Sequence, residues 1–112
     1  MVVGVTTPRR GEVHVVALDP TLGRQIKKTR PALVVSPDQL NAHLGTYLVA
    51  PLTTGGRERP FRISCRFEGR DGFAVLDQLR TVDDVRVGKR LGRISPATLK
   101  EVLATLRQMF EE

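Results

Sequence analysis

The sequence is poor in the residues that build many binding sites. Its 112 residues include no tryptophan, one tyrosine, one cysteine and two histidines. A single cysteine, Cys65, excludes an internal disulfide framework and a cysteine-rich zinc site. The two histidines, His14 and His43, lie far apart in the sequence, so we expect no metal site. The shortage of aromatic residues also argues against a stacking platform for single-stranded nucleic acid.

Long apolar segments are missing as well. No run approaches the roughly 20 residues that cross a bilayer, and the N-terminus lacks the apolar core of a signal peptide. We therefore expect a cytoplasmic protein with no membrane partner. The length suits a single domain over residues 1–112, in which we expect residues 1–8 to form a flexible or edge N-terminal extension.

Acidic residues are fewer than basic ones. The chain has 18 Lys and Arg residues against 12 Asp and Glu residues, which gives a net charge of +6. The surplus belongs to residues 1–94, because the segment from Ser95 onward is net acidic. Such an excess favours a polyanionic partner, most often nucleic acid. A basic surface that is merely solvated is the alternative explanation.

The hydrophobic pattern is that of short strands. In residues 61–67, Phe61, Ile63, Cys65 and Phe67 alternate with polar residues, which predicts a half-buried strand with Cys65 in the core. The dense apolar run 32–36 predicts a strand buried on both faces. Further strands are expected at Glu12–Leu18, Tyr47–Leu52, Gly72–Leu76, Arg80–Val82 and Arg90–Ile94.

One helix is expected at the C-terminal end. Ser95 is a suitable N-cap and Pro96 suits the first helical position. An apolar stripe then recurs at helical spacing, at Leu99, Val102, Leu103, Leu106 and Phe110. Several short strands followed by a helix predict a mainly β fold, curled into a small barrel.

Two loops carry candidate chemistry. The first, residues 20–31, has four cations and no acid, so it is either an anion-binding loop or a solvated one. Its last cation, Arg30, directly precedes Pro31 and a core strand, so we expect it to be held by a rigid element. The second loop, residues 51–60, joins Thr53 and Thr54 to a Gly-Gly turn. Together with Arg57, this is either a phosphate cradle or a simple hairpin turn.

A polar run, residues 77–81, interrupts the later strands. For Asp77, a structural hydrogen-bonding role is the favoured interpretation, whereas Gln78 fits a structural role and a functional role equally.

Taken together, these pieces resemble the MazF/PemK family of toxin endoribonucleases over roughly residues 9–110. The matching segments are Arg10-Gly11-Glu12-Val13, Asp19-Pro20-Thr21, Gly23, Thr29-Arg30-Pro31, Pro51-Leu52-Thr53-Thr54, Asp77-Gln78-Leu79-Arg80-Thr81-Val82, Arg90-Leu91-Gly92-Arg93 and Ser95-Pro96. The resemblance implies an SH3-like barrel of the CcdB/PemK type, with a C-terminal helix, that works as a homodimer. It implies the toxin of a type II toxin–antitoxin system, with an acidic, MazE-like antitoxin as partner.

The same resemblance implies sequence-specific cleavage of single-stranded RNA without metal or cofactor, leaving 2′,3′-cyclic phosphate and 5′-hydroxyl ends. The family's catalytic arginine matches Arg30, and its strand-end hydroxyl matches Thr53. Gln25 stands where many members have a glutamate that can act as a base, and an amide cannot take up a proton. The expected RNA-binding residues are Arg24, Lys27, Lys28, Thr54, Arg57, Gln78 and Arg80.

Three alternatives remain open at this stage. The chain is compatible with a CcdB-like gyrase poison on the same fold, because fold alone does not decide function. It is also compatible with a basic RNA-binding module that has lost catalysis. A third interpretation makes His14 and His43 an acid–base pair.

Overall fold

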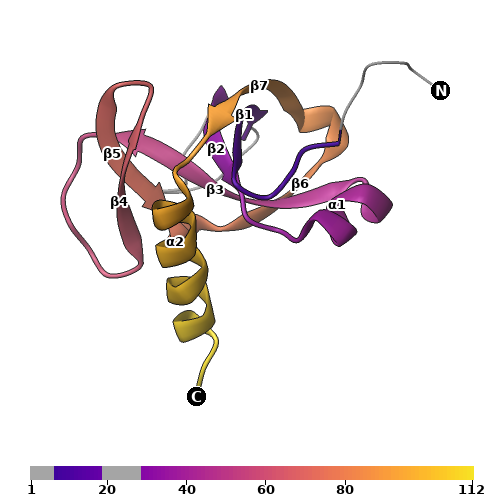
Figure 1. Ribbon diagram of the computed structural model, residues 1–112. Coiled ribbons are helices and arrows are strands. Elements are labelled where there is room, and N and C mark those ends of the chain that lie inside the picture. Colours follow the sequence, from indigo (N-terminus) through magenta and orange to yellow (C-terminus); the bar gives the residue numbers. More distant parts are fainter. Residues whose placement is uncertain (1–6, 19–28) are drawn as a thin grey trace.

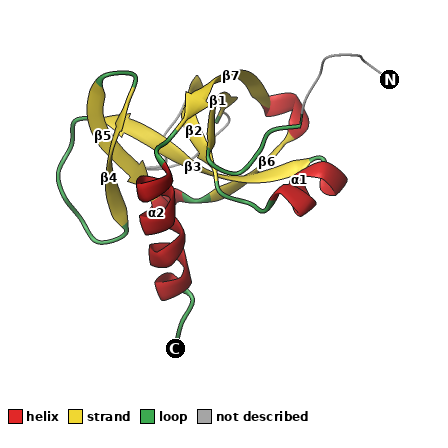
Figure 2. Cartoon of the chain, in the orientation of Figure 1, coloured by secondary structure: helices red, strands yellow, loops and turns green. Residues whose placement is uncertain are grey.

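A computed structural model describes residues 7–18 and 29–112 (Figures 1 and 2). The chain forms seven strands, two α-helices and two short 3₁₀ helices among these residues. In chain order they are β1 (Glu12–Ala17), β2 (Thr29–Val34), α1 (Asp38–Leu44), β3 (Thr46–Thr54), β4 (Arg62–Phe67), β5 (Arg70–Val75), η1 (Leu76–Gln78), β6 (Arg80–Asp83), η2 (Asp84–Arg86), β7 (Val87–Arg93) and α2 (Pro96–Met109). The expected mainly β fold with a C-terminal helix is confirmed.

The strands form one antiparallel sheet in the order β4-β5-β3-β2-β1-β7, with β6 paired to β3 beside this path. The long strand β3 is central, because successive parts of it pair with β6, β2 and β5. The sheet is curled but open in the described part of the chain, since β4 and β7 share no ladder. The two edge strands approach each other where the Phe67 ring of β4 lies beside the backbone of β7: a Cβ on Gly92 would lie 3.3 Å from that ring.

The two faces of the sheet bury separate clusters, which explains the apolar runs in the central strands. In β2, Leu33 joins the cluster that α2 covers, whereas its neighbours Ala32 and Val34 join the cluster on the other face. Successive residues of a strand point to opposite faces, so such a strand has no polar side. The expectation that residues 32–36 are buried on both faces is confirmed, although β2 itself starts at Thr29.

Helix α2 begins as the sequence predicts. The Ser95 hydroxyl oxygen accepts the backbone N–H of Thr98 at 3.2 Å, and Pro96 occupies the first turn. Val102 is fully buried, and Leu99 and Leu106 of the stripe pack against the same cluster. The prediction is wrong for Phe110, which is 76% exposed because the helix ends at Met109 and the backbone then leaves the helical conformation.

Helix α1 was not predicted, because it lacks an apolar stripe. Its one buried side chain is polar: Asn41 donates from Nδ2 to the Ser36 carbonyl at 3.1 Å and accepts from the Ser36 hydroxyl. Its leucines, Leu40 and Leu44, are exposed. Gly45 ends the helix in the left-handed region, at φ +67°, where glycine is favoured.

Candidate active site

A cleft of about 500 Å³ opens where β2, β3 and the β4–β5 hairpin meet. The residues that line it are Arg30, Pro31, Leu52, Thr53, Thr54, Cys65, Phe67, Glu68 and Arg70. Two elements that the sequence separates, the start of β2 and the end of β3, therefore bring Arg30 and Thr53 into one site. This volume lies within the range typical of small-ligand pockets.

Arg30 is the second residue of β2, where it pairs with Val16 of β1. Its backbone is thus part of the sheet, while its side chain is exposed. Its guanidinium forms no hydrogen bond or ion pair with any residue that the structure describes. A planar fork of N–H donors on a fixed strand is consequently available to an anion in the cleft.

Thr53 is half-buried near the end of β3, opposite Phe73 of β5. Its hydroxyl donates to the Phe73 carbonyl at 3.5 Å, which is long for such a bond and easily exchanged for a ligand oxygen. Gly72 makes this arrangement possible, because a Cβ there would lie 1.6 Å from the Thr53 carbonyl oxygen. A glycine inside a strand often marks such a close backbone approach.

The expected phosphate cradle after β3 forms only in part. Thr54 lines the cleft beside Thr53, and Gly55 and Gly56 turn the chain with positive φ. The Gly55 N–H, however, already donates to the Asp71 carbonyl at 3.1 Å. Arg57 lies in the exposed loop after the turn and does not line the cleft.

The other predicted site residues lie outside the cleft or outside the described residues. Arg80, on β6, donates to the Leu18 carbonyl at 2.9 Å and so fastens the end of β1. Gln78 lies on η1, away from the residues that line the cleft. Four predicted residues lie outside the described part of the chain: Arg24, Gln25, Lys27 and Lys28.

Asp77 has the structural role that was favoured from the sequence. Both of its carboxylate oxygens accept from Arg62 of β4, each at 3.0 Å. The hydrogen bonds from Arg62 lower the pKa of Asp77, and burial opposes them only in part. This bidentate pair links η1 to the β4–β5 hairpin that forms one wall of the cleft.

Cys65 is a core residue, 8% exposed, and burial raises the pKa of its thiol. It lines the floor of the cleft as a small apolar side chain rather than as a nucleophile. The neighbouring residue predicted on the same face, Phe61, precedes β4 and is 41% exposed with φ +62°, so that part of the alternation is wrong.

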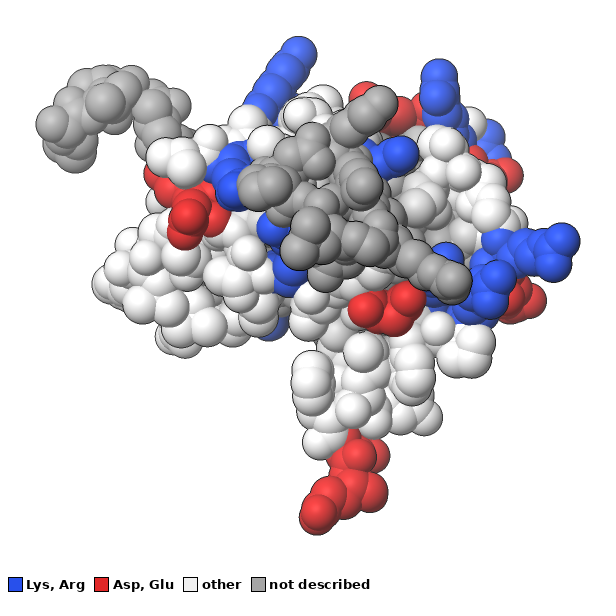
Figure 3. All heavy atoms as spheres, turned by 180° about the vertical axis from the view of Figure 1, so that it is seen from behind, with Lys and Arg blue, Asp and Glu red and all other residues white. Residues whose placement is uncertain are grey.

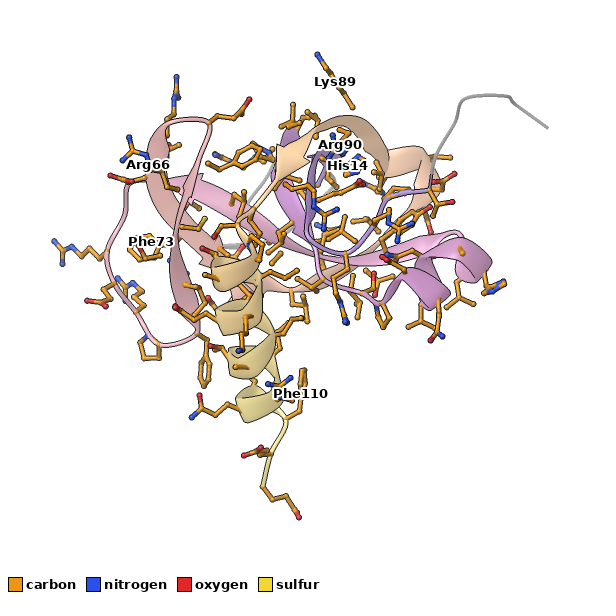
Figure 4. The ribbon with its side chains drawn as sticks, viewed as in Figure 1. His14, Arg66, Phe73, Lys89, Arg90 and Phe110 are labelled. Carbon is orange, nitrogen blue, oxygen red and sulfur yellow. The ribbon has the colours of Figure 1, made fainter. Side chains whose placement is uncertain are left out.

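His14 and His43 do not form a pair. His14 is buried on β1, with Nε2 3.0 Å from a Glu12 carboxylate oxygen and Nδ1 3.1 Å from the Gly88 carbonyl. His43 lies exposed on α1. Figure 4 shows His14 next to Arg90, whose Nε donates to the same Glu12 carboxylate at 3.0 Å. The buried Glu12 and His14, together with the exposed Arg90, thus join β1 to β7.

Two charged residues of the cleft were missed from the sequence, Glu68 and Arg70. They flank Gly69 at the β4–β5 turn and reach the cleft because β5 pairs with β3. A glycine between two β-type runs indicates a hairpin turn, but no local signal places that turn beside the end of β3. Residues 7–18 and 29–112 contain no group of three or more His, Cys, Asp or Glu residues arranged to hold a metal ion.

Basic side chains lie at several places on the back of the molecule, with acidic ones between them. Figure 3 shows Lys and Arg over the sheet, whereas the acidic chain end beyond α2 projects away from them. No helix in the described part of the chain has both the length and the apolar character needed to traverse a membrane.

Residues 9–110 match the family described as PemK-like, MazF-like toxin of type II toxin–antitoxin system. The chain belongs to this family. It is 40% identical over 103 residues to endoribonuclease PemK of Escherichia coli, covering 87% of this chain and 77% of PemK. It is 32% identical over 104 residues to endoribonuclease toxin MazF of E. coli K12, covering 92% and 94% of the two chains.

Solved structures of MazF-type toxins have the same fold as this chain. MazF from Deinococcus radiodurans superposes with a TM-score of 0.82 at 26% identity, covering 94% of this chain and 97% of that one. A mycobacterial endoribonuclease in complex with its cognate antitoxin superposes with a TM-score of 0.75 at 25% identity, covering 90% and 92%.

Proposed function

We propose that this protein is the endoribonuclease toxin of a type II toxin–antitoxin system and that it cleaves single-stranded RNA at specific sequences without metal. The observation that carries the proposal is the shared cleft of Arg30 and Thr53, the two residues to which the family resemblance assigns catalysis. Relatives named endoribonuclease PemK and MazF support it. Because RNA is the proposed substrate, we place the activity in the cytoplasm.

The reaction requires a ribose 2′-oxygen to attack the adjacent phosphorus while the 5′-oxygen leaves. Negative charge then builds on the phosphoryl oxygens. The Arg30 guanidinium can donate two parallel hydrogen bonds to that charge. One well-placed donor of this kind is worth about 3–4 kcal/mol, or roughly 10²–10³ in rate. The products are a 2′,3′-cyclic phosphate and a 5′-hydroxyl.

Thr53 supplies a second donor in this proposal. Its long bond to the Phe73 carbonyl can be replaced by a shorter bond to a phosphoryl oxygen without leaving a strong interaction unmade. Arg70 on the opposite wall adds a second positive charge. The remaining predicted RNA-binding residues would follow the strand beyond the cleft through charge and hydrogen bonds.

We further propose two protein partners. An acidic antitoxin segment would cover the cleft, in keeping with the mycobacterial relative solved with its antitoxin and with the net charge of +6. A second copy of the chain would form a homodimer through a groove of about 440 Å³ beside α2. Its apolar walls include Leu79, Leu103 and Leu106, and exposed Phe110 stands at its end.

The test is incubation with a long single-stranded RNA in EDTA, with both new ends mapped. We expect cyclic phosphates and 5′-hydroxyls from the wild-type protein and at least tenfold fewer cuts from Arg30→Ala purified in parallel. Lys89→Ala is the matched control, because Lys89 is an exposed cation that points away from the molecule (Figure 4).

Identical cutting by wild type and Arg30→Ala would contradict the proposal, since the cuts would then come from elsewhere. Binding of RNA without cleavage would show a binding module instead. Inhibition of gyrase without action on RNA would show a CcdB-like poison.

A further inference from the structure

The cleft contains a carboxylate that the resemblance does not account for. Among the described residues that line it, Glu68 is the one acid, and it lies with the cations Arg30 and Arg70 and the hydroxyls of Thr53 and Thr54. Its carboxylate forms no ion pair or hydrogen bond with any described residue. An unpaired acid is therefore free to meet a substrate in a cleft that is otherwise cationic.

The backbone at Glu68 is unusual. Glu68 has φ +52° and Gly69 has φ +75°, so the two residues form a tight turn between Phe67 and Arg70, which pair across the hairpin. Glycine and asparagine are the residues that favour this conformation, and a glutamate in it is held there by its surroundings. Backbone conformations of this kind concentrate at functional sites.

The turn is braced on both sides. The Arg66 guanidinium donates to the Gly69 carbonyl at 3.4 Å and forms an ion pair with Asp71 at 3.3 Å. On the other side, the ring of Phe67 lies against Gly92 of β7. The turn that carries Glu68 thus has contacts on both sides, while the Glu68 carboxylate has no polar partner among the described residues.

Attack by a 2′-hydroxyl needs an acceptor for its proton. Gln25, at the position of the family glutamate, carries an amide, which cannot serve. Within the described part of the cleft, the guanidinium groups hold their protons, and hydroxyls are poor bases. The buried thiol of Cys65 has a raised pKa and stays protonated. Glu68 is the group that remains.

We propose that the Glu68 carboxylate is the general base of RNA cleavage, an inference that rests on the endoribonuclease function proposed above. The carboxylate takes the 2′-hydroxyl proton as the 2′-oxygen forms its bond to phosphorus. The bond from phosphorus to the 5′-oxygen breaks, and that oxygen takes a proton from water. Glu68 then returns its proton to the solvent, so no co-reactant is consumed.

The experiment compares Glu68→Asn, Glu68→Gln and Glu68→Asp with the wild-type protein. Cleavage of a short single-stranded RNA with one mapped site is followed under single-turnover conditions in EDTA across an acidic to neutral pH range. Asparagine is the key substitution, because it removes the carboxylate but suits the positive φ of the turn. Glu58→Gln is the matched control, since Glu58 is an exposed acid outside the cleft.

We expect Glu68→Asn and Glu68→Gln to lose about 10²–10⁴-fold in rate, the usual contribution of general base catalysis. A rate that depends on a carboxylate base falls at acid pH, so the wild-type profile should show an acid limb that both variants lack. Glu68→Asp, which keeps a carboxylate, should retain part of the rate and the acid limb. Thermal melting should show Glu68→Asn folded and at least as stable as wild type, and its affinity for uncut RNA should not fall.

Cleavage by Glu68→Asn within about threefold of wild type at every pH would overturn the assignment. So would an unchanged acid limb in that variant. A wild-type protein that does not cleave RNA would contradict the proposed function. Cleavage that is unaffected by the Glu68 substitutions would contradict only the assignment of Glu68 as the base.

Discussion

At the scale of single residues, we expect the exposed guanidinium of Arg30 to matter for RNA cleavage and not for the stability of the fold. It forms no hydrogen bond or ion pair with a described residue, so we expect its replacement to leave the folded structure almost unchanged. We expect Arg30→Ala to reduce RNA cleavage by about 10²–10³-fold with melting unaffected. Arg30→Lys should recover only part of the rate, because an ammonium keeps the charge but loses the planar fork. Full activity in Arg30→Lys would mean that charge alone suffices.

Glu12 is the residue whose charge stabilises the fold. It is 8% exposed; burial raises the pKa of its carboxyl, but hydrogen bonds from His14, the Arg9 N–H and Arg90 outweigh burial and hold that pKa below its ordinary 4.5. A lowered pKa in the folded state stabilises the protein above the unfolded pKa, and this contribution disappears as pH falls through the folded one. The cluster thus links the stability of the β1–β7 pairing to acid pH.

We expect Glu12→Gln to lower the free energy of unfolding at pH 7 by about 1–3 kcal/mol, because His14 and Arg90 lose a charged partner. The difference from wild type should shrink as the pH falls through the lowered pKa of the folded state, because the wild-type carboxylate then also becomes protonated. Thermal melts at pH 7 and pH 3 measure both effects, with Glu58→Gln as the exposed control. A constant difference at both pH values would exclude the carboxylate charge as the cause.

Arg30 and Thr53, which the structure brings into one cleft, could be singled out from the sequence because local signals mark them. Arg30 stands before a proline and a core strand, and Thr53 stands at a strand end before two glycines. Glu68 and Arg70 carry no such signal, because they reach the cleft only through the pairing of β5 with β3. Their assignment to the site required the fold.

At the scale of elements, the contact between β3 and β5 sets the shape of the cleft. Gly72 permits it, because any side chain would collide with the Thr53 carbonyl at 1.6 Å. We expect Gly72→Ala to push the hairpin away from β3, to lower the free energy of unfolding by about 1–3 kcal/mol and to reduce cleavage by displacing Glu68. Ser64→Ala, an exposed change on the same hairpin, should do neither. RNA-cleavage rates and thermal melting curves of both variants and of the wild-type protein test this prediction.

The success of prediction at this scale follows from how each element is stabilised. Helix α2 can be predicted because its N-cap and its apolar stripe follow each other directly in the sequence. Helix α1 was missed because its one buried side chain, Asn41, is anchored by hydrogen bonds to Ser36, which no periodicity reveals. The expectation of a curled barrel was only partly correct, since the two sheet edges meet through Phe67 and Gly92 without a hydrogen-bonded ladder.

At the scale of the whole molecule, the chain presents a basic side and an apolar one. The cleft holds the cations Arg30 and Arg70, whereas the groove beside α2 is lined in part by Leu103 and Leu106. The groove also includes Phe110, which is 76% exposed, and an exposed apolar surface rimmed by polar residues is typical of an interaction site. A second copy would cover it, and self-association through one shared patch gives the two-fold symmetry usual in homodimers.

We therefore expect light scattering at micromolar concentration to give twice the chain mass of 12.4 kDa. Phe110→Glu should shift the protein to monomers, because a charge at the groove would lose its hydration in the dimer. Leu44→Glu is the matched control, since Leu44 is an exposed leucine on α1 outside the groove. A wild-type monomer, or dimers that survive Phe110→Glu, would move the interface away from this groove. Because the cleft and the groove have different linings, cleavage by the Phe110→Glu monomer would show whether one protomer carries a complete active site.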